Sequence, residues 1–331
     1  MTHAPILVLG AAGHTGRFVV AELARRGLSA VAAGRDAGKL AAAHPGVERR
    51  VVDLADPAAL DRALAGCAAV IHCAGPFIDT ADAVVAAALR ARVPYLDVSA
   101  EQLTAIAVHE RWAEAAQAAG VAVVPAMAFF GGLGDLLATA ALGDWPDADE
   151  IALAVGLDRW QPTEGTRRTD TPRRVVVAGG QLVPVAEPAP TRRWPFPPPF
   201  GEQDVVSVPM SEIILIARHL RVRDVQSFIN LAPLADLRDA TMPPPVAVDD
   251  RGRSAQQFVV EAVARRGGQA RRLRARGQDI YAITAPLVCE AAARILDGRS
   301  ARTGVAAPGA LFDPRDFLAA LAPDLTIEDV A

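Results

Sequence analysis

The chain has 331 residues, of which 51% are hydrophobic and 22% charged, and its formal net charge is −4. This length predicts two domains, and the mild charge argues against a nucleic acid or an anionic membrane surface as the partner. Three cysteines without a C-x-x-C motif argue against a disulfide framework and a cysteine zinc site, and they indicate a reducing cytoplasm.

The first segment has the pattern of a strand, a glycine turn and a helix. An apolar run at 6–9 precedes Gly10-Ala11-Ala12-Gly13-His14-Thr15-Gly16, and a helical pattern follows over 14–26. Such a turn lets the backbone approach a diphosphate and directs the N–H groups of a helix N-terminus toward it. We therefore expect a dinucleotide diphosphate to bind at Gly10, Gly13, His14, Thr15 and Gly16. The alternative is a glycine turn that holds no ligand.

The second strand, expected at 29–34, predicts which dinucleotide binds. It ends in Gly34-Arg35, where an acidic residue would bind a ribose 2′-hydroxyl and an arginine suits a 2′-phosphate. We expect Gly34, Arg35 and Lys39 to surround that phosphate, and Asp36 to cap the helix at 36–43 and point away. The segment is thus predicted to bind NADP(H).

Strands and helices continue to alternate up to residue 124. Further strands are expected at 47–52, 68–72, 95–98 and 121–124, with helices from 56, at 80–91 and at 102–119. Strands rich in Val, Ile and Ala between amphipathic helices indicate a parallel sheet that is covered on both faces. The predicted fold class is α/β, with a Rossmann-type doubly wound parallel sheet over 1–128 and residues 281–331 packing back onto it.

An apolar stretch at 120–143 has the length of a membrane span and carries Asp135 as its single charge. Pro125 and the glycines at 131, 132 and 134 interrupt it. We interpret it as a buried strand, a loop and a helix from about Leu133, and we expect no segment that spans a membrane.

The pattern changes after residue 145 and predicts a second α+β domain of mostly antiparallel strands over 129–280. Strands are expected at 151–157, 175–178, 182–185, 222–230, 257–264 and 269–276, with hairpin turns at Gly179-Gly180 and Gly267-Gly268. The proline-rich segment 186–200 is expected to be an extended loop, either a lid or a plain surface connection. Helices are expected at 211–219, 283–296 and 313–321.

Ligands of open α/β sheets bind beyond the carboxyl ends of the strands, so the loops at these ends hold further candidates. Asp53 and Leu54 follow the third strand, where they would hold the adenine; alternatively, Asp53 caps the loop. The fourth strand is followed by small residues that allow close approach and by a ring that would pack on the ribose or nicotinamide: Ala74, Gly75, Pro76 and Phe77.

Five spaced motifs cover residues 5–137: G-x-x-G-H-T-G-R at 10–17, Gly34-Arg35-Asp36 with Lys39-Leu40, His72 to Phe77, Pro94 to Glu101, and Gly131 to Leu137. Together they resemble the saccharopine dehydrogenase-like family of NAD(P)-dependent oxidoreductases. A weaker likeness lies in the segment Gly277 to Tyr281, which precedes a long helix. The resemblance implies a Rossmann domain, a second domain with the substrate cleft between the two, and often a homodimer.

Two residues are candidates for the chemistry. Asp97 ends the fifth strand with Tyr95 two residues before it, and it would exchange a proton with the substrate or orient it; the alternative is a cap of the helix at 102–119. Tyr281 precedes the helix at 283–296, and its hydroxyl would reach the substrate. Glu101 is expected to support the helix at 102–119, and His72 to be a hydrogen-bonded core residue.

These observations predict an NADP(H)-dependent oxidoreductase that transfers a hydride to or from a small carbonyl, imine or activated alkene in an interdomain cleft. The alternative hypothesis is an NADP-binding sensor or regulatory protein without turnover, because the sequence contains no unmistakable acid–base pair. We expect a small-molecule substrate and a cytoplasmic homodimer, and we expect no nucleic acid, no membrane and no bound metal.

Overall fold

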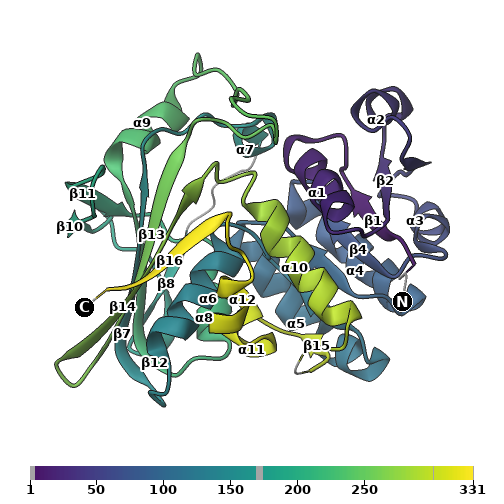
Figure 1. The fold of residues 1–331 in the computed structure, drawn as a ribbon. Helices are drawn as coiled ribbons and strands as arrows, with labels where there is room; N and C mark the ends of the chain where they lie inside the picture. The colour runs from purple at the N-terminus through teal and green to yellow at the C-terminus, as the bar shows by residue number, and fades with distance from the viewer. Residues whose placement is uncertain (1–3, 169–173, 301, 331) are drawn as a thin grey trace. The chain divides into compact units, whose positions relative to one another are not determined.

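A computed structural model describes residues 4–168, 174–300 and 302–330. The chain divides into two compact units, whose ribbons are drawn in Figure 1. Unit 1 contains Met1–Phe129 and Thr284–Phe312, and unit 2 contains Phe130–Ile283 and Asp313–Ala331. Residues 313–331, which we expected beside the nucleotide domain, therefore group with unit 2, where their strand pairs.

Unit 1 is built around a parallel sheet of seven strands in the order β15-β6-β5-β4-β1-β2-β3. β1 is paired with β2 on one side and with β4 on the other, so the order in which the chain adds strands reverses beside β1. Ligands of doubly wound sheets bind at such a point. The predicted Rossmann-type sheet is confirmed; its strands are β1 (Ile6–Leu9), β2 (Ala30–Gly34), β3 (Glu48–Val51), β4 (Ala69–His72), β5 (Tyr95–Asp97), β6 (Ala122–Val124) and β15 (Gly304–Val305).

Two helices of unit 1 begin at an aspartate that caps them. Asp36 accepts a hydrogen bond from the Lys39 N–H at 2.9 Å and starts α2, and Asp56 accepts one from the Ala58 N–H and starts α3. Pro57 occupies the first turn of α3, where no N–H is needed. The helices are α1 (His14–Arg25), α2 (Ala37–Ala43), α3 (Pro57–Leu64), α4 (Phe77–Ala91), α5 (Gln102–Ala119), α10 (Thr284–Leu296) and α11 (Pro308–Leu311).

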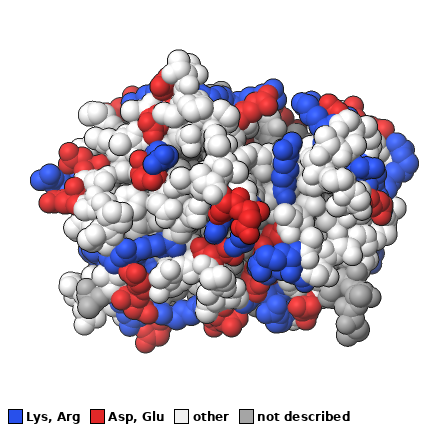
Figure 2. Space-filling model, turned by 45° about the horizontal axis from the view of Figure 1, so that its top comes forward, with Lys and Arg blue, Asp and Glu red and all other residues white. Residues whose placement is uncertain are grey.

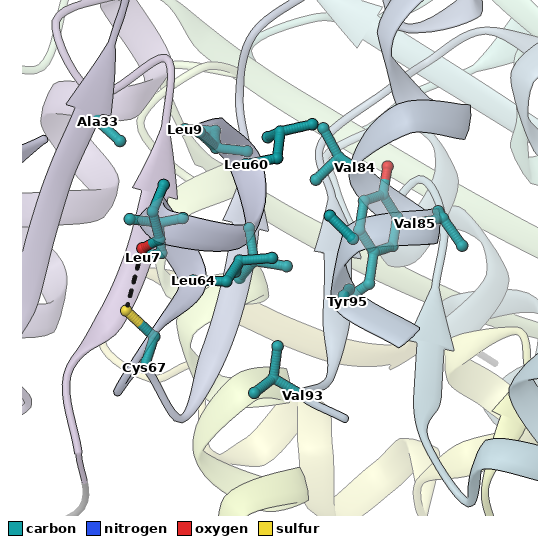
Figure 3. Packing of buried hydrophobic residues seen from close by; sticks show 14 of the residues in the cluster. Leu7, Leu9, Ala33, Leu60, Leu64, Cys67, Val84, Val85, Val93 and Tyr95 are labelled. Carbon is teal, nitrogen blue, oxygen red and sulfur yellow. Dashed lines mark hydrogen bonds between the residues drawn. The ribbon is translucent and has the colours of Figure 1, made fainter. Parts of the chain in front are cut away.

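A buried cluster of apolar side chains joins this sheet to α3, α4 and α5. Figure 3 shows Leu7 and Leu9 of β1 close to Leu60 and Leu64 of α3. All four are at most 1% exposed, and burying each leucine side chain contributes about 2 kcal/mol to folding. The alternation of Leu7 and Leu9 directs both to this face, which positions the turn after β1.

Helix α10 belongs to unit 1 although it lies far along the chain, and it packs against α1. Arg26, which ends α1, pairs with Glu22 at 2.6 Å and also with Glu290 of α10. Arg294 pairs with the same Glu290 at 2.7 Å. The carboxylates of Glu22 and Glu290 are nearly buried and each has a guanidinium partner, so the network costs no unpaired charge and fixes α10 on α1.

Unit 2 contains a mixed sheet with the strand order β10-β11-β12-β7-β13-β14-β16, and β8 and β9 branch from β12. Among the described strands, β12 pairs with β7 in parallel and the other pairings are antiparallel, so the predicted, mostly antiparallel sheet is confirmed. The strands are β7 (Ala148–Leu157), β8 (Val175–Ala178), β9 (Gln181–Pro184), β10 (Thr191–Pro195), β11 (Glu202–Ser207), β12 (Val222–Asn230), β13 (Gln257–Arg266), β14 (Gln269–Gln278) and β16 (Leu325–Val330).

Three strands of unit 2, β10, β11 and β16, were not expected from the sequence. The proline-rich segment 186–200 was expected to be a loop, but it contains β10, which pairs with β11 at the edge of the sheet. Pro195 is the last residue of that edge strand, where its missing N–H is tolerated. Trp194 is buried and its indole Nε1–H donates to Glu261 at 2.7 Å, which anchors the segment. Strand β16 has no turn signal before it and is stabilised by its pairing with β14.

The helices of unit 2 include one that is buried on every side. α6 extends over Gly131–Leu142, and its residues are buried except Thr139. A Cβ atom on Gly134 would lie 2.9 Å from the Cβ of Glu212 in α8, so the glycine permits close packing of the two helices. The other helices are α7 (Glu164–Arg168), α8 (Glu212–Ala217), α9 (Leu231–Arg238) and α12 (Pro314–Ala319).

Basic and acidic side chains are interspersed on the face drawn in Figure 2, where blue and red atoms alternate between white areas. Mixed charges of this kind agree with a formal net charge of −4 and give no extended field of one sign on that face. Among the described helices, none is both long and apolar enough to cross a membrane.

Candidate functional site

The turn between β1 and α1 is closed by backbone contacts that only glycine permits. Gly10 has a φ of 77°, and a Cβ atom there would lie 2.8 Å from the Ala74 N and from the Cys73 carbonyl. A Cβ atom on Gly16 would lie 2.3 Å from the Gly10 oxygen. The turn therefore lies directly on the loop after β4, and α1 begins directly on the turn.

Helix α1 has Gly13 as its N-cap, so the residue in the capping position brings no side chain to the first turn. The N–H of Gly13 donates to the Gly10 oxygen at 2.9 Å, which closes the turn, and His14 and Thr15 are the first two helical residues. The positive end of the helix dipole faces this turn, an arrangement that suits a diphosphate.

The N-terminus of α2 places two cationic side chains beyond β2. Arg35 and Lys39 are both exposed, and Gly34 ends the strand. Asp36 lies between them in sequence, but its carboxylate is bound to the Lys39 N–H, as we expected of a capping residue. The charge of Asp36 is thereby engaged by its own helix, and the binding of a 2′-phosphate by Arg35 and Lys39 stays a prediction.

The loop after β3 has a local hydrogen bond of its own. The Asp53 carboxylate accepts from the Ala55 N–H at 3.0 Å, and Asp53 is exposed. Leu54 is half-buried and packs against the apolar cluster of unit 1. Asp53 therefore caps its own loop, which is one of the two roles we considered for it. Its contact with the adenine stays a prediction.

Two side chains hold the loop Ala74-Gly75-Pro76-Phe77. The Thr80 hydroxyl donates to the carbonyl oxygens of Ala74 and Pro76, each 3.0 Å away, and lies 2.9 Å from His72 Nε2. Glu101 accepts from the N–H groups of Phe77 and Ile78 at 3.0 and 2.8 Å. These contacts fix the first turn of α4 directly after the loop.

The role of Glu101 differs from the sequence expectation. We expected it to support the helix at 102–119, and its carboxylate does accept from the Thr104 hydroxyl at 2.6 Å. Its two backbone bonds, however, cap α4, whose own N-cap is Pro76 and has no side chain for that purpose. A proline in the capping position is the one sequence signal for an external cap, but it does not identify the residue that provides it.

His72 lies at the end of β4 and is fully buried, as the core interpretation predicted. Burial lowers the pKa of its imidazole from 6.5 to about 3, so the ring is neutral at physiological pH. Its ring packs edge-to-face on Phe77 with 5.1 Å between the centroids. A neutral, packed imidazole is a support for the loop after β4.

Asp97 is fully buried at the end of β5, and its carboxylate accepts three hydrogen bonds. The donors are the N–H groups of Ser99 and Ala126, at 3.0 and 2.8 Å, and the hydroxyl of Tyr95 at 2.9 Å. Burial raises the pKa of Asp97 from 3.8 to about 6, against the opposing effect of these bonds. The carboxylate therefore ties the loops after β5 and β6 together, which favours its orienting role over proton transfer.

Tyr281 belongs to unit 2, and its hydroxyl is engaged by a neighbouring segment. The indole Nε1–H of Trp160 donates to it at 3.0 Å, the Thr163 N–H donates at 3.4 Å, and the Thr166 hydroxyl lies 3.0 Å away. Burial raises the pKa of this phenol above its ordinary value of 10.0. The hydroxyl thus holds the segment 160–166 in place.

Asp135 is the single charge of the apolar stretch at 120–143 and part of the motif Gly131 to Leu137. The structure places it inside α6, fully buried, with its carboxylate 2.7 Å from His219 Nε2. The motif therefore serves helix packing and a buried acid–imidazole pair within unit 2. Among the described residues, no group of three or more His, Cys, Asp or Glu side chains is arranged to hold a metal ion.

Unit 1 thus brings most of the predicted cofactor residues to one edge of its sheet. The glycine turn follows β1, Gly34 ends β2 and Arg35 follows it, and the loop 74–77 follows β4, all at carboxyl ends of adjacent parallel strands. Asp97 ends the next strand, β5. Tyr281 is the predicted residue that this unit does not contain.

Comparison with known proteins identifies a domain family for the N-terminal part of the chain. Residues 6–127 match the saccharopine dehydrogenase NADP binding domain. The whole fold is similar to that of apo saccharopine dehydrogenase (L-Glu forming) from Saccharomyces cerevisiae, with 15% identity, a TM-score of 0.68, and coverage of 99% of this chain and 100% of that one. At 15% identity, the match to the yeast enzyme shows a similar fold and nothing more.

Two other solved structures match shorter parts of the chain. An NADPH-dependent quinone oxidoreductase from Escherichia coli is 23% identical over 41% of this chain and 52% of its own, with a TM-score of 0.30. A uronate dehydrogenase from Agrobacterium tumefaciens is 27% identical over 31% of this chain and 42% of its own, with a TM-score of 0.26. No curated protein sequence matches.

The glycine turn gives a first testable prediction. Gly10→Ala adds a methyl group that would overlap the Cys73 carbonyl, whereas Gly27→Ala adds one at a similar φ of 70° with nothing within 4 Å. We expect Gly27→Ala to cost about 1 kcal/mol of unfolding free energy from backbone strain alone, and Gly10→Ala to cost roughly 2 kcal/mol more. Urea denaturation measures both, and equal losses would contradict the close approach of the turn to the loop after β4.

Asp97 gives a prediction about pH. Its folded pKa of about 6 lies above the ordinary 3.8, so the stabilising contribution of its proton is present below about pH 4 and lost as pH rises through 6. Between pH 4.5 and 7.5 this loss amounts to roughly 2 kcal/mol, and in Asp97→Asn it should vanish because the amide does not titrate. Denaturation at pH 4.5 and 7.5 compares the two proteins; parallel pH dependences in both would be evidence against the raised pKa.

Glu101 gives a third prediction. Glu101→Ala leaves two N–H groups of α4 without their acceptor and should lower the unfolding free energy by about 1–2 kcal/mol. Glu101→Gln keeps one acceptor oxygen and should lose less. Asp79→Ala, an exposed acid in the same first turn, is the control for the loss of charge near the helix dipole. A loss as large in Asp79→Ala as in Glu101→Ala would refute the capping role.

Proposed function

We propose that the chain, whose residues 6–127 match the saccharopine dehydrogenase NADP binding domain, is an NAD(P)-dependent oxidoreductase that transfers a hydride between NADP(H) and a small carbonyl, imine or activated alkene. The observation that carries the proposal is the turn at Gly10–Gly16, which has no room for a Cβ at Gly10 or Gly16 and begins a helix. When bound, the nicotinamide supplies or accepts the hydride.

The residues at this edge of unit 1 fit the parts of the dinucleotide. Gly10, Gly13, His14, Thr15 and Gly16 would hold the diphosphate, because the turn offers backbone donors at the positive end of α1. The exposed side chains of Arg35 and Lys39, next to Gly34, would hold the 2′-phosphate. The remaining contacts would come from the loops after β3 and β4: Asp53, Leu54, Ala74, Gly75, Pro76 and Phe77.

We propose an orienting role for both catalytic candidates. The Asp97 carboxylate holds the loops after β5 and β6 through the N–H groups of Ser99 and Ala126, and Tyr281 holds the segment around Trp160 in unit 2. Fixing such loops contributes to catalysis by positioning the reactants and excluding water. The substrate cleft between the domains, the homodimer and the cytoplasmic location follow from the sequence reasoning and stay predictions.

Cofactor selectivity tests the proposal. In Arg35→Ala the 2′-phosphate loses a charge-assisted bond, so the Kd for NADPH should rise by roughly 10- to 100-fold while the Kd for NADH stays unchanged. Titrations that follow nicotinamide fluorescence measure both constants. Arg62→Ala, which removes an exposed arginine of α3, is the matched control and should change neither.

The possible outcomes separate the hypotheses. Failure of the folded protein to bind either dinucleotide would mean that the glycine turn is structural, and the proposal would be wrong. Unchanged NADPH affinity in Arg35→Ala would overturn the 2′-phosphate assignment alone. Binding without NADPH consumption across carbonyls, imines and activated alkenes would favour the NADP-binding sensor instead.

A further inference from the structure

A buried histidine contacts the glycine turn from the far end of α2. His44 is the C-cap residue of that helix and is 6% exposed. Its Nε2 lies 2.9 Å from the carbonyl oxygen of Ala11. Because a carbonyl oxygen only accepts, Nε2 must carry the proton and donate it.

Both backbone groups of Ala11, its N–H and its carbonyl, are hydrogen-bonded. Its N–H donates to the Ala33 oxygen at 3.1 Å, and the Gly10 N–H donates to the same oxygen at 2.9 Å. These bonds attach the turn to β2, and the bond from His44 attaches it to the end of α2. The turn that is proposed to bind the diphosphate is thus anchored to β2 and to the end of α2.

The bond from His44 also fixes the direction of a donor. The carbonyl of Ala11 and the N–H of Ala12 belong to one planar trans peptide and point in opposite directions. Holding that carbonyl toward α2 therefore directs the Ala12 N–H away from α2. Among the described residues, no acceptor for this N–H is found, whereas the next one, of Gly13, is bound to the Gly10 oxygen.

We propose that His44 is a positioning residue for the cofactor diphosphate: its Nε2–H holds the Ala11 carbonyl and thereby orients the Ala12 N–H as a donor to the phosphate oxygens. This inference rests on the proposed binding of NADP(H) at the glycine turn. The diphosphate is common to NADPH and NADH, whereas the 2′-phosphate is not. His44 therefore acts on both dinucleotides alike, and Arg35 on NADPH alone.

Paired substitutions test the donor. The amide of Gln places a nitrogen where His Nε2 lies, whereas that of Asn is too short to reach it, so His44→Gln keeps the bond to Ala11 and His44→Asn and His44→Leu lose it. We expect Kd to rise about tenfold for NADPH and for NADH in the Asn and Leu variants, with an unchanged ratio between the two cofactors, and to change little in His44→Gln.

His109→Leu is the matched control for His44→Leu. His109 is also buried, at 8% exposure, and its Nδ1 lies 2.9 Å from a backbone carbonyl, but that carbonyl belongs to Ala105 of its own helix α5. A general loss of stability would affect this variant and the His44 variants equally. Thermal melts identify which variants are folded. The Kd of His44→Gln is then compared with that of His44→Asn or His44→Leu, whichever is folded.

Each result has one meaning. Equal Kd values in His44→Gln and a folded loss variant overturn the inference, as does a rise in Kd for NADPH alone. An increase in Kd in His109→Leu as large as in His44→Leu also overturns it, because the effect would then be one of stability. If the unsubstituted protein binds neither dinucleotide, the proposed function fails, and the inference that rests on it fails with it.

Discussion

The close approach of the β1–α1 turn to the loop after β4 is the constraint on which the nucleotide edge of unit 1 depends. A Cβ atom on Gly10 would lie 2.8 Å from the Cys73 carbonyl, and one on Gly16 would lie 2.3 Å from the Gly10 oxygen. Without these glycines the turn could not lie on its neighbouring loop, and α1 could not begin there. The register of β1 with β2 and β4 then brings the three adjacent loops to one edge.

Buried polar side chains fix the loops at that edge. Asp97 joins the loops after β5 and β6, Glu101 caps the helix after β4, and His44 holds the turn after β1. Each makes at least one hydrogen bond to the backbone of a loop or turn, and these bonds offset part of the cost of removing the side chain from water. Loops fixed in this way require little ordering when a ligand binds, which lowers the entropic cost of binding.

Local sequence signals predicted most elements because they act within a few residues. Apolar runs of four or five residues between capped helices gave the parallel sheet, and Asp36 and Asp56 marked the starts of α2 and α3. Signals that depend on remote partners were missed. β10 forms in a proline-rich segment because Trp194 is anchored on Glu261, and β16 forms because β14 offers an edge.

The sequence by itself determined the glycine turn, the cationic pair Arg35 and Lys39 at the end of the second strand, and the alternation that makes the sheet parallel. Each is a matter of neighbouring residues, since backbone freedom, charge and hydrophobic periodicity are local properties. Only the tertiary structure decided that Glu101 caps α4, that Asp97 is buried under three donors, and that His44 reaches Ala11. The reason is that these contacts join residues up to 33 positions apart, and their partners are chosen by how the elements pack.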